Sequence, residues 1–280
     1  MRFDKLEYVA TGVPQAPDVL TIEANGSARY ESHSNEATPD RPEIGTYQTA
    51  LPADEMQALG KLLDNPPFQI VPDHWGKVVS GESSRRIRIT AGQEKIEKFI
   101  AFRAPIDPAM LRAMAALDQI IAKVKSHPRH TLRVQLTQAA VAADKTLTAH
   151  LSFSNTGVEP VNVRSPLAAM AGEGCRLTFE TWPDKARSDV RPEDAALVNV
   201  VGVEPLPPTA GPANTQPCLT LAPRASAAFL IRATVAARHA GPYFIRARYE
   251  NFGGEAGGSP LLVGELYSQA VRVTVPQSAP

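Results

Sequence analysis

Alternating hydrophobic and polar residues predict several β-strands in the first 127 residues. In the stretch VLTIE at 19–23, Leu20 and Ile22 share one face, and a second alternating stretch follows at 28–31. The Asn25-Gly26 pair between them is a strong β-hairpin signal, because both residues tolerate positive φ angles. The other expected strands are an edge strand at 3–9, a strand at 44–51, and a second hairpin formed by 85–90 and 96–102.

Two helices are predicted by apolar residues at helical spacing. Pro52 suits the first turn of one helix, where an N–H group is not needed, and Asn65-Pro66-Pro67 is expected to end that helix. Asp107 is placed as the N-cap of the second helix, with Pro108 at its first position. The order of elements predicts a small α+β domain with two helices on one antiparallel sheet. The expected buried stripes are Met56, Leu59, Leu62 and Leu63, then Met110, Met114, Leu117, Ile121 and Val124.

The pattern changes at His127-Pro128-Arg129. Seven of the nine lysines precede this point, and no convincing helix is visible after it. Many short strands separated by turn residues are typical of an all-β immunoglobulin-like sandwich. We therefore expect an α+β domain at 1–127 and a β-sandwich domain at 128–280. The expected strands are 131–137, 146–154, 160–164, 176–181, 196–203, 218–221, 227–235, 243–249 and 269–275.

The strand expected at 243–249 alternates cleanly between two kinds of residue. Phe244, Arg246 and Arg248 should lie on one face of the strand. The opposite face should carry the apolar side chains that form a core. Those residues are Tyr243, Ile245, Ala247 and Tyr249.

Charge and hydropathy narrow the class of partner. The formal net charge is zero, whereas a nucleic-acid-binding protein normally carries a basic surplus. No run reaches the roughly 18 apolar residues of a membrane helix, and the stretch after Met1 lacks an apolar signal region. These features favour a cytoplasmic protein that binds neither nucleic acid nor membrane. Cys175 and Cys218 are then expected as free thiols, with a disulfide left open for an exported protein.

Sequence motifs for chemistry are missing. There is no G-x-S-x-G nucleophile motif, no C-x-x-C or H-E-x-x-H metal motif and no phosphate-binding loop. The glycine-rich stretch 253–258 is read as a mobile hairpin loop instead. Binding residues concentrate on such loops when a rigid scaffold carries them. Cys175 follows Gly172-Glu173-Gly174 directly before an expected strand, and a reactive thiol there would need a cationic or helix N-terminal setting. We expect no catalytic residue, no cofactor and no metal.

Several loops carry candidate residues for contact with a partner protein. His74 and Trp75 form an unusual pair that could anchor a ligand, although a Trp75 that caps the sheet edge is the simpler reading. The charged segments 31–43 and 183–194, and the proline-rich segment 204–217, are read as exposed connections or recognition surfaces. The candidate partner-binding residues in the charged segments are Glu31, Glu36, Asp40, Asp184, Arg187, Asp189 and Arg191.

The second half resembles a known type of β-sandwich. Residues 147–163 read LTAHLSFSNTGVEPVNV, and residues 219–249 run from LTLAPRASAAFLIR to AGPYFIRARY. This order of strand ends and turns resembles the immunoglobulin-like modules of the bacterial intracellular proteinase inhibitor type. No inhibitory loop can be matched residue by residue. In overall character the chain is similar to bacterial toxin-immunity proteins.

Three functions remain as hypotheses. The first is a non-catalytic intracellular inhibitor or immunity protein that covers the active site of a bacterial toxin. The second is a structural, secretion- or phage-associated β-sandwich module. The third is an enzyme with a dispersed site between the domains, in which Asp73 and Glu82 would be the acids and His74 the base.

Overall fold

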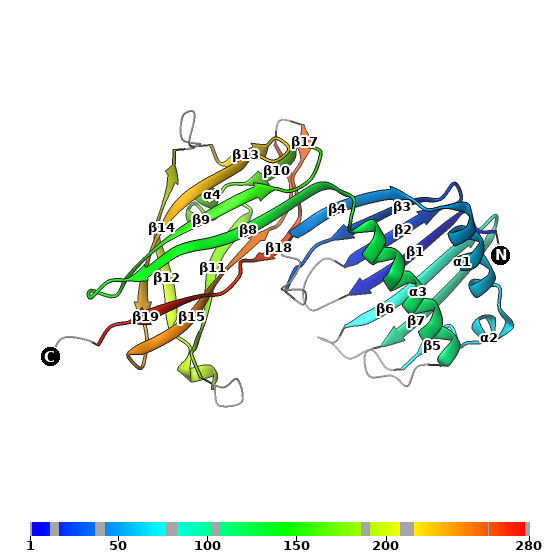
Figure 1. Cartoon of the computed structure of the whole chain (residues 1–280), viewed down its shortest axis with the longest axis horizontal. Helices are drawn as coiled ribbons and strands as arrows, with labels where there is room; N and C mark the ends of the chain where they lie inside the picture. Colours follow the sequence, from blue (N-terminus) through cyan, green and yellow to red (C-terminus); the bar gives the residue numbers. More distant parts are fainter. Residues whose placement is uncertain are drawn as a thin grey trace. The chain divides into compact units, whose positions relative to one another are not determined.

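The computed structural model is rich in β-strands arranged in antiparallel sheets (Figure 1). It describes residues 2–11, 17–36, 43–76, 83–101, 107–185, 191–207, 216–256 and 258–277. By internal packing the chain forms two units, one of Met1–His33 with Gly45–Arg129 and one of Ser34–Ile44 with His130–Pro280. Within the described ranges, no helix is both long and apolar enough to cross a membrane.

The sheet of unit 1 has the strand order β4-β3-β2-β1-β6-β7-β5. Adjacent strands in this sheet run antiparallel, except that β5 pairs with β7 in parallel. The Asn25-Gly26 hairpin is confirmed, with Gly26 at a φ of +84° and Ser27 N donating to Asn25 Oδ1 at 2.9 Å. The strands are β1 (Lys5–Thr11), β2 (Asp18–Glu23), β3 (Ser27–Ser32), β4 (Glu43–Ala50), β5 (His74–Trp75), β6 (Ser84–Ala91) and β7 (Glu94–Ala101).

One expectation about this sheet was wrong, because β1 is not an edge strand. It pairs with β2 on one side and with β6 on the other. Leu6 and Tyr8 are consequently buried in the core of unit 1. Local alternation predicts a strand, but it does not reveal that a segment about 80 residues later in the chain will cover its second edge.

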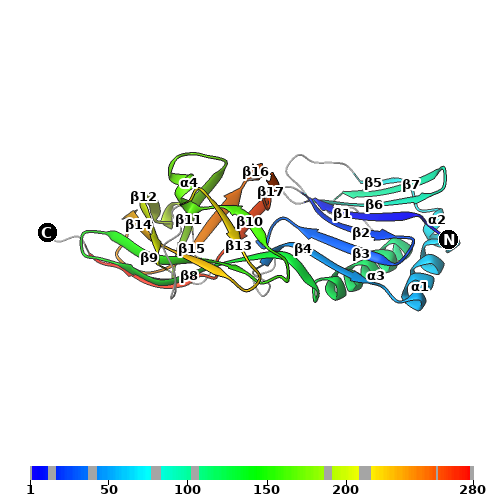
Figure 2. The ribbon, with the colours of Figure 1, turned by 90° about the horizontal axis from the view of Figure 1, so that it is seen from above.

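The two predicted helices are α1 (Ala53–Leu63) and α3 (Pro108–Val124). Asp107 caps α3 as expected, because its Oδ1 accepts a hydrogen bond from Ala109 N at 2.7 Å. Pro66 and Pro67 follow the end of α1 and also form the first turn of a short helix, α2 (Pro66–Gln69). Figure 2 shows α1 and α3 on the same face of the sheet, and their apolar residues share one core with the strands.

Unit 2 contains two larger sheets whose buried residues form a single core. The first has the order β12-β14-β9-β8; in the second β11, β15 and β18 follow one another, and β19 also pairs with β15. Phe153 of β9 lies edge-on to Tyr249 of β15, with ring centroids 4.9 Å apart, so it links the two sheets. The strands are β8 (Pro128–Val141), β9 (Thr146–Asn155), β11 (Cys175–Pro183), β12 (Leu197–Leu206), β14 (Ser226–Ala236), β15 (Gly241–Asn251), β18 (Gly264–Tyr267) and β19 (Val271–Val275).

Smaller elements complete unit 2. The strand pairs are β10 (Val161–Arg164) with β13 (Cys218–Leu221), and β16 (Glu255–Ala256) with β17 (Ser259–Pro260). A helix that the sequence reading missed, α4 (Pro166–Met170), begins after Ser165, whose hydroxyl accepts from Leu167 N at 3.0 Å. A 3-10 turn lies at Pro192–Asp194. Cys175 and Cys218 are both free thiols.

Candidate functional site

The outer side of the sheet β11-β15-β18 is the most organised polar surface of unit 2 among the described residues. Alternation along β15 is as predicted: Tyr243 and Tyr249 are buried, whereas Arg246 and Arg248 point away from the core. We use the term outer face for the residues of these strands that point away from the core, together with the segment that binds them. These residues are Asn35, Glu36, Arg176, Glu180, Trp182, Phe244, Arg246, Arg248, Glu250, Glu265 and Tyr267.

Strand register determines which charged residues meet on the outer face. On one side of β15, Glu180 of β11 is the direct partner of Arg246, which carries the opposite charge. On the other side, two like charges stand opposite each other, Glu250 and Glu265 of β18, and Arg248 donates to both carboxylates. Directly opposite side chains lie about 4.5–5.5 Å apart at Cβ, so their charges interact strongly.

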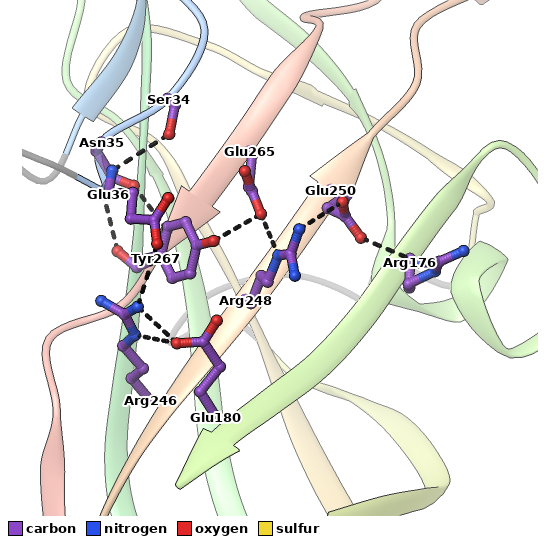
Figure 3. Close-up of polar contacts among 10 residues, drawn as sticks. All are labelled: Ser34, Asn35, Glu36, Arg176, Glu180, Arg246, Arg248, Glu250, Glu265 and Tyr267. Carbon is purple, nitrogen blue, oxygen red and sulfur yellow. Dashed lines mark hydrogen bonds and ion pairs between the residues drawn. The ribbon is translucent and has the colours of Figure 1, made fainter. Parts of the chain in front are cut away.

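Figure 3 shows Arg246 beside Glu180 and Glu36. Arg246 Nε and Nη2 lie 2.7 and 2.5 Å from Glu180 Oε2, and Nη2 is 3.8 Å from Glu36. The guanidinium also lies over the ring of Tyr267, 4.2 Å from the centroid. Only 24% of the Arg246 side chain is exposed. Ion pairs and a cation–π contact thus hold a half-buried arginine in one position.

Arg248 connects two carboxylates. Its Nε donates to Glu265 Oε1, and its Nη2 donates to Glu250 Oε1 at 3.0 Å. Glu265 is 2% exposed and also accepts a hydrogen bond from Tyr267 Oη at 2.7 Å. Burial, together with the hydrogen bond to Glu265 and its charge, raises the pKa of the Tyr267 phenol well above its ordinary value. Tyr267 therefore stays a neutral donor at neutral pH.

Two carboxylate oxygens on this face are buried and lack a hydrogen bond. They are Glu250 Oε2 and Glu265 Oε2. Arg176 Nη1 stands 3.7 Å from Glu250 Oε2, an ion-pair distance rather than a hydrogen-bond distance. The charges of the face are therefore only partly satisfied within the chain.

A segment from between β3 and β4 is attached to the edge of β18. The Asn35 side chain donates from Nδ2 to Tyr267 O at 2.9 Å, and its Oδ1 accepts from Tyr267 N at 2.7 Å. Ser34 forms a parallel bridge with Glu265. Asn35 is buried, so its amide replaces the backbone partner that this edge of β18 would otherwise need.

Aromatic side chains extend the outer face beyond the charged residues. Trp182 stacks on Phe244 with centroids 5.9 Å apart, and Arg246 lies 5.9 Å from the Trp182 ring. Phe252, 60% exposed, lies 6.0 Å from the Arg176 guanidinium. Large aromatics normally fill cores, and these three rings lie outside the core of unit 2.

The outer face combines carboxylates that arginines bind with partly exposed arginine and aromatic side chains. Glu180, Glu250 and Glu265 are all engaged by arginines. Among the residues that the structure describes, no group of three or more His, Cys, Asp or Glu side chains could hold a metal ion. Its partly exposed arginine and aromatic groups can contact a partner through ion pairs and stacking.

Of the predicted partner-binding residues that the structure describes, two contact this sheet. Glu36 is part of the outer face, and Asp184, just after β11, accepts from Arg272 Nε at 2.7 Å. Arg191 is exposed and lies 3.9 Å from Glu193. The predicted residues Asp40, Arg187 and Asp189 lie outside the described residues.

The other predicted residues belong to unit 1. Glu31 on β3 pairs with Arg29 at 2.7 Å. His74 on β5 stacks on Phe99 with centroids 4.9 Å apart, and β2, β1, β6 and β7 separate β3 from β5. The backbone of Trp75 pairs with Ile100, and its side chain lies outside the described part.

The acid and base residues of the dispersed-site hypothesis are only partly described. Asp73 pairs with the buried Lys98 at 2.8 Å, and Lys98 also donates to Val71 O at 2.6 Å. Glu82 lies outside the described ranges. The enzyme hypothesis therefore stays a prediction.

The sequence reading missed the carboxylates of the outer face. Alternation placed Arg246 and Arg248 on one face, but Glu180 and Glu265 come from other strands. Their proximity depends on register, which the hydrophobic pattern alone does not reveal. The one available signal was the isolated Glu265 in an apolar context, LLVGELY at 261–267.

Comparison with known proteins identifies no family. No protein-family model matches the chain, and no curated protein matches it. Several solved structures are remotely similar to this chain, among them three with the following coverage and TM-scores. The structure described as "AvmM Catalyzes Macrocyclization in Alchivemycin A Biosynthesis" has 14% identity, covers 53% of this chain and 90% of its own, and has a TM-score of 0.29.

The other two similar structures are equally remote. Escherichia coli alpha-2-macroglobulin activated by porcine elastase has 13% identity, covers 85% of this chain and 13% of its own, and has a TM-score of 0.28. The extracellular portion of mouse CD200RLa has 6% identity, covers 99% of this chain and 88% of its own, and has a TM-score of 0.18. Similarities at these TM-scores assign neither a fold family nor a function to this chain.

Proposed function

We propose that this chain is a non-catalytic protein that binds another protein through the outer face of unit 2. The observation that carries the proposal is the half-exposed, fixed group of arginine and aromatic side chains around Arg246. Trp, Tyr and Arg are enriched among the residues that dominate binding energy at protein interfaces. A sheet supports them, so they form a rigid surface.

Fixed side chains make binding less costly. Immobilising a long side chain at an interface costs about 0.5–1.5 kcal/mol each. Arg246 and Arg248 already have defined partners in the free chain. A partner that contacts them therefore avoids most of that cost.

Within this function, we propose an intracellular inhibitor or immunity protein that covers the active site of a bacterial toxin. The outer face carries both charge signs and the stacked rings of Trp182 and Phe244, which suits a specific protein surface of mixed charge. A specific interface of this kind buries on the order of 1,600 Å² in total. For the fold, we propose an α+β domain followed by an immunoglobulin-like sandwich; two sheets around one core support the latter.

Affinity capture with matched variants tests the proposal. Wild-type chain and two arginine variants, Arg246→Ala and Arg232→Ala, would be used as bait in extract from the source cell. Arg232 belongs to the other large sheet and pairs with Glu204 at 3.3 Å, so it is the same kind of ion-paired arginine away from the outer face. Circular dichroism would first show that both variants fold.

The expected result is one specific partner retained by wild type and Arg232→Ala. Its affinity for Arg246→Ala should fall at least about 30-fold, the size of an interface hot spot. Recovery of the same partner by all three baits, or of no partner by the wild type, would show that the outer face is not the binding surface. Inhibition of the partner's activity by the wild type would support the inhibitor assignment, and unchanged activity would overturn it.

A further inference from the structure

Two glycine loops of unit 2 meet at the side chain of Arg164. Arg164 ends β10, and its guanidinium lies against Gly174, before β11, and Gly254, after β15. A Cβ atom added to Gly174 would stand 2.5 Å from Arg164 Nε and 2.9 Å from Cζ. One added to Gly254 would stand 3.3 Å from Nη2. Only glycine lets the backbone approach this guanidinium so closely.

Among the described residues, the Arg164 guanidinium has no hydrogen-bond partner. Its Nε is buried and makes no hydrogen bond to any of them. Within the described part of the chain the two Nη atoms also lack a hydrogen bond or ion pair, yet they are not buried. An arginine with a buried nitrogen is almost always paired with an acid. Arg164 therefore presents a positive charge that nothing in the described chain neutralises.

The backbone around Arg164 is held in place. Tyr249 Oη donates to Arg164 O at 2.5 Å, and Arg164 is the cross-strand partner of Cys218. The Cys175 thiol and the Tyr249 phenol lie nearby but do not supply a negative charge. Burial raises the pKa of both groups, so both stay neutral. The backbone that carries the cation is thus held in place, and no ion pair with a described residue compensates its charge.

We propose that Arg164, enclosed by Gly174 and Gly254, binds a small anion through a phosphate or carboxylate group. The two free Nη atoms suit the paired oxygens of such a group, which an arginine binds with two parallel hydrogen bonds. The site lies on β10 and the two glycine loops and is distinct from the outer face. It does not depend on the proposed partner protein.

Calorimetric titration of the full chain tests the site. Inorganic phosphate forms one arm and acetate the other, each against chloride at equal ionic strength. The variant Arg164→Gln removes the charge, and Arg238→Gln removes an exposed arginine of the same unit as a matched control. Saturable binding is expected in wild type and Arg238→Gln, with affinity reduced at least about tenfold in Arg164→Gln.

A pair of glycine variants tests the geometry. Gly174→Ala places a methyl group against Arg164, whereas Gly172→Ala has an equally positive φ and no atom within 4 Å of its new Cβ. Binding should weaken in Gly174→Ala and persist in Gly172→Ala. If Gly174→Ala does not fold, the comparison of Arg164→Gln with Arg238→Gln still decides.

Each arm has a decisive outcome. Tighter binding of phosphate assigns a phosphoryl group to the ligand, and tighter binding of acetate assigns a carboxylate. If neither anion binds wild type, or if Arg164→Gln binds as well as wild type, the proposal is overturned.

Discussion

At the scale of single residues, unit 2 depends on a few buried polar side chains. Asn35 completes the edge of β18, and Arg248 connects Glu250 with the buried Glu265. Alternation in the sequence predicted that Arg248 would point away from the core. It did not predict the role of Asn35, because an asparagine in a polar segment is typical of an exposed loop.

Replacement of Asn35 tests this role. Asn35→Ala removes two hydrogen bonds and leaves the N–H and C=O of Tyr267 buried without partners, so the free energy of unfolding should fall by about 1–3 kcal/mol. Asn199→Ala on β12, where the side chain is exposed, should change it by less than about 0.5 kcal/mol. Urea unfolding measures both. Equal values for the two variants would mean that Asn35 does not hold the segment to β18.

The raised pKa of Tyr267 predicts that the free energy of unfolding falls at alkaline pH. This pKa is raised in the folded chain by burial and by Glu265, whereas an unfolded tyrosine ionises near pH 10. Above about pH 10 the unfolded state therefore binds fewer protons than the folded state, and the free energy of unfolding falls as pH rises. Below that pH the contribution of Tyr267 is fully present.

Unfolding in urea between pH 8 and 11.5 measures this dependence. Tyr267→Phe should lose stability less steeply above pH 10 than the wild type, because its unfolded state has one fewer phenol that loses its proton in this range. The same steepness in both chains would contradict the assignment of a raised pKa to Tyr267. The comparison concerns slopes, so the lost hydrogen bond to Glu265 does not affect it.

At the scale of elements, local signals located the two longer helices, α1 and α3, and most strands. Asp107-Pro108 predicted the start of α3, and Ser165-Pro166 carries the same signal before α4. The second signal was missed because α4 is only five residues long and shows no helical periodicity. The pairing of β1 with β6 was missed because alternation of hydrophobic residues predicts a strand but does not indicate which distant strand it pairs with.

The hairpin between β2 and β3 offers a matched test of turn geometry. Gly26→Ala combines a φ of +84° with a Cβ only 2.8 Å from the backbone oxygen of Leu51. Gly92→Ala, in the turn between β6 and β7, has a φ of +60° and no neighbour within 4 Å.

The two variants should therefore differ in thermal stability. Gly92→Ala should lose about 1 kcal/mol from the left-handed backbone alone, and Gly26→Ala should lose clearly more, because backbone must move. Thermal unfolding gives both values. A larger loss in Gly92→Ala would contradict the close packing of Gly26 against Leu51.

At the scale of the whole molecule, the chain passes three times between its two units, after His33, Ile44 and Arg129. The sequence showed a change of pattern near His127-Pro128-Arg129 but did not indicate that Ser34 and Asn35 contact β18. The sequence around these two residues is polar, so no local signal distinguishes residues that bind a strand edge from an exposed loop. The domain limits 1–127 and 128–280 stay a prediction, and each unit has its own core.

The central claim is that the outer face binds a protein partner. Hydrogen–deuterium exchange of the full chain, with and without the captured partner, tests it most directly. The account predicts slower exchange in β11, β15 and β18, with no change in β12 and β14 of the opposite sheet. Protection confined to β12 and β14 or to unit 1, with β11, β15 and β18 unchanged, would contradict the claim.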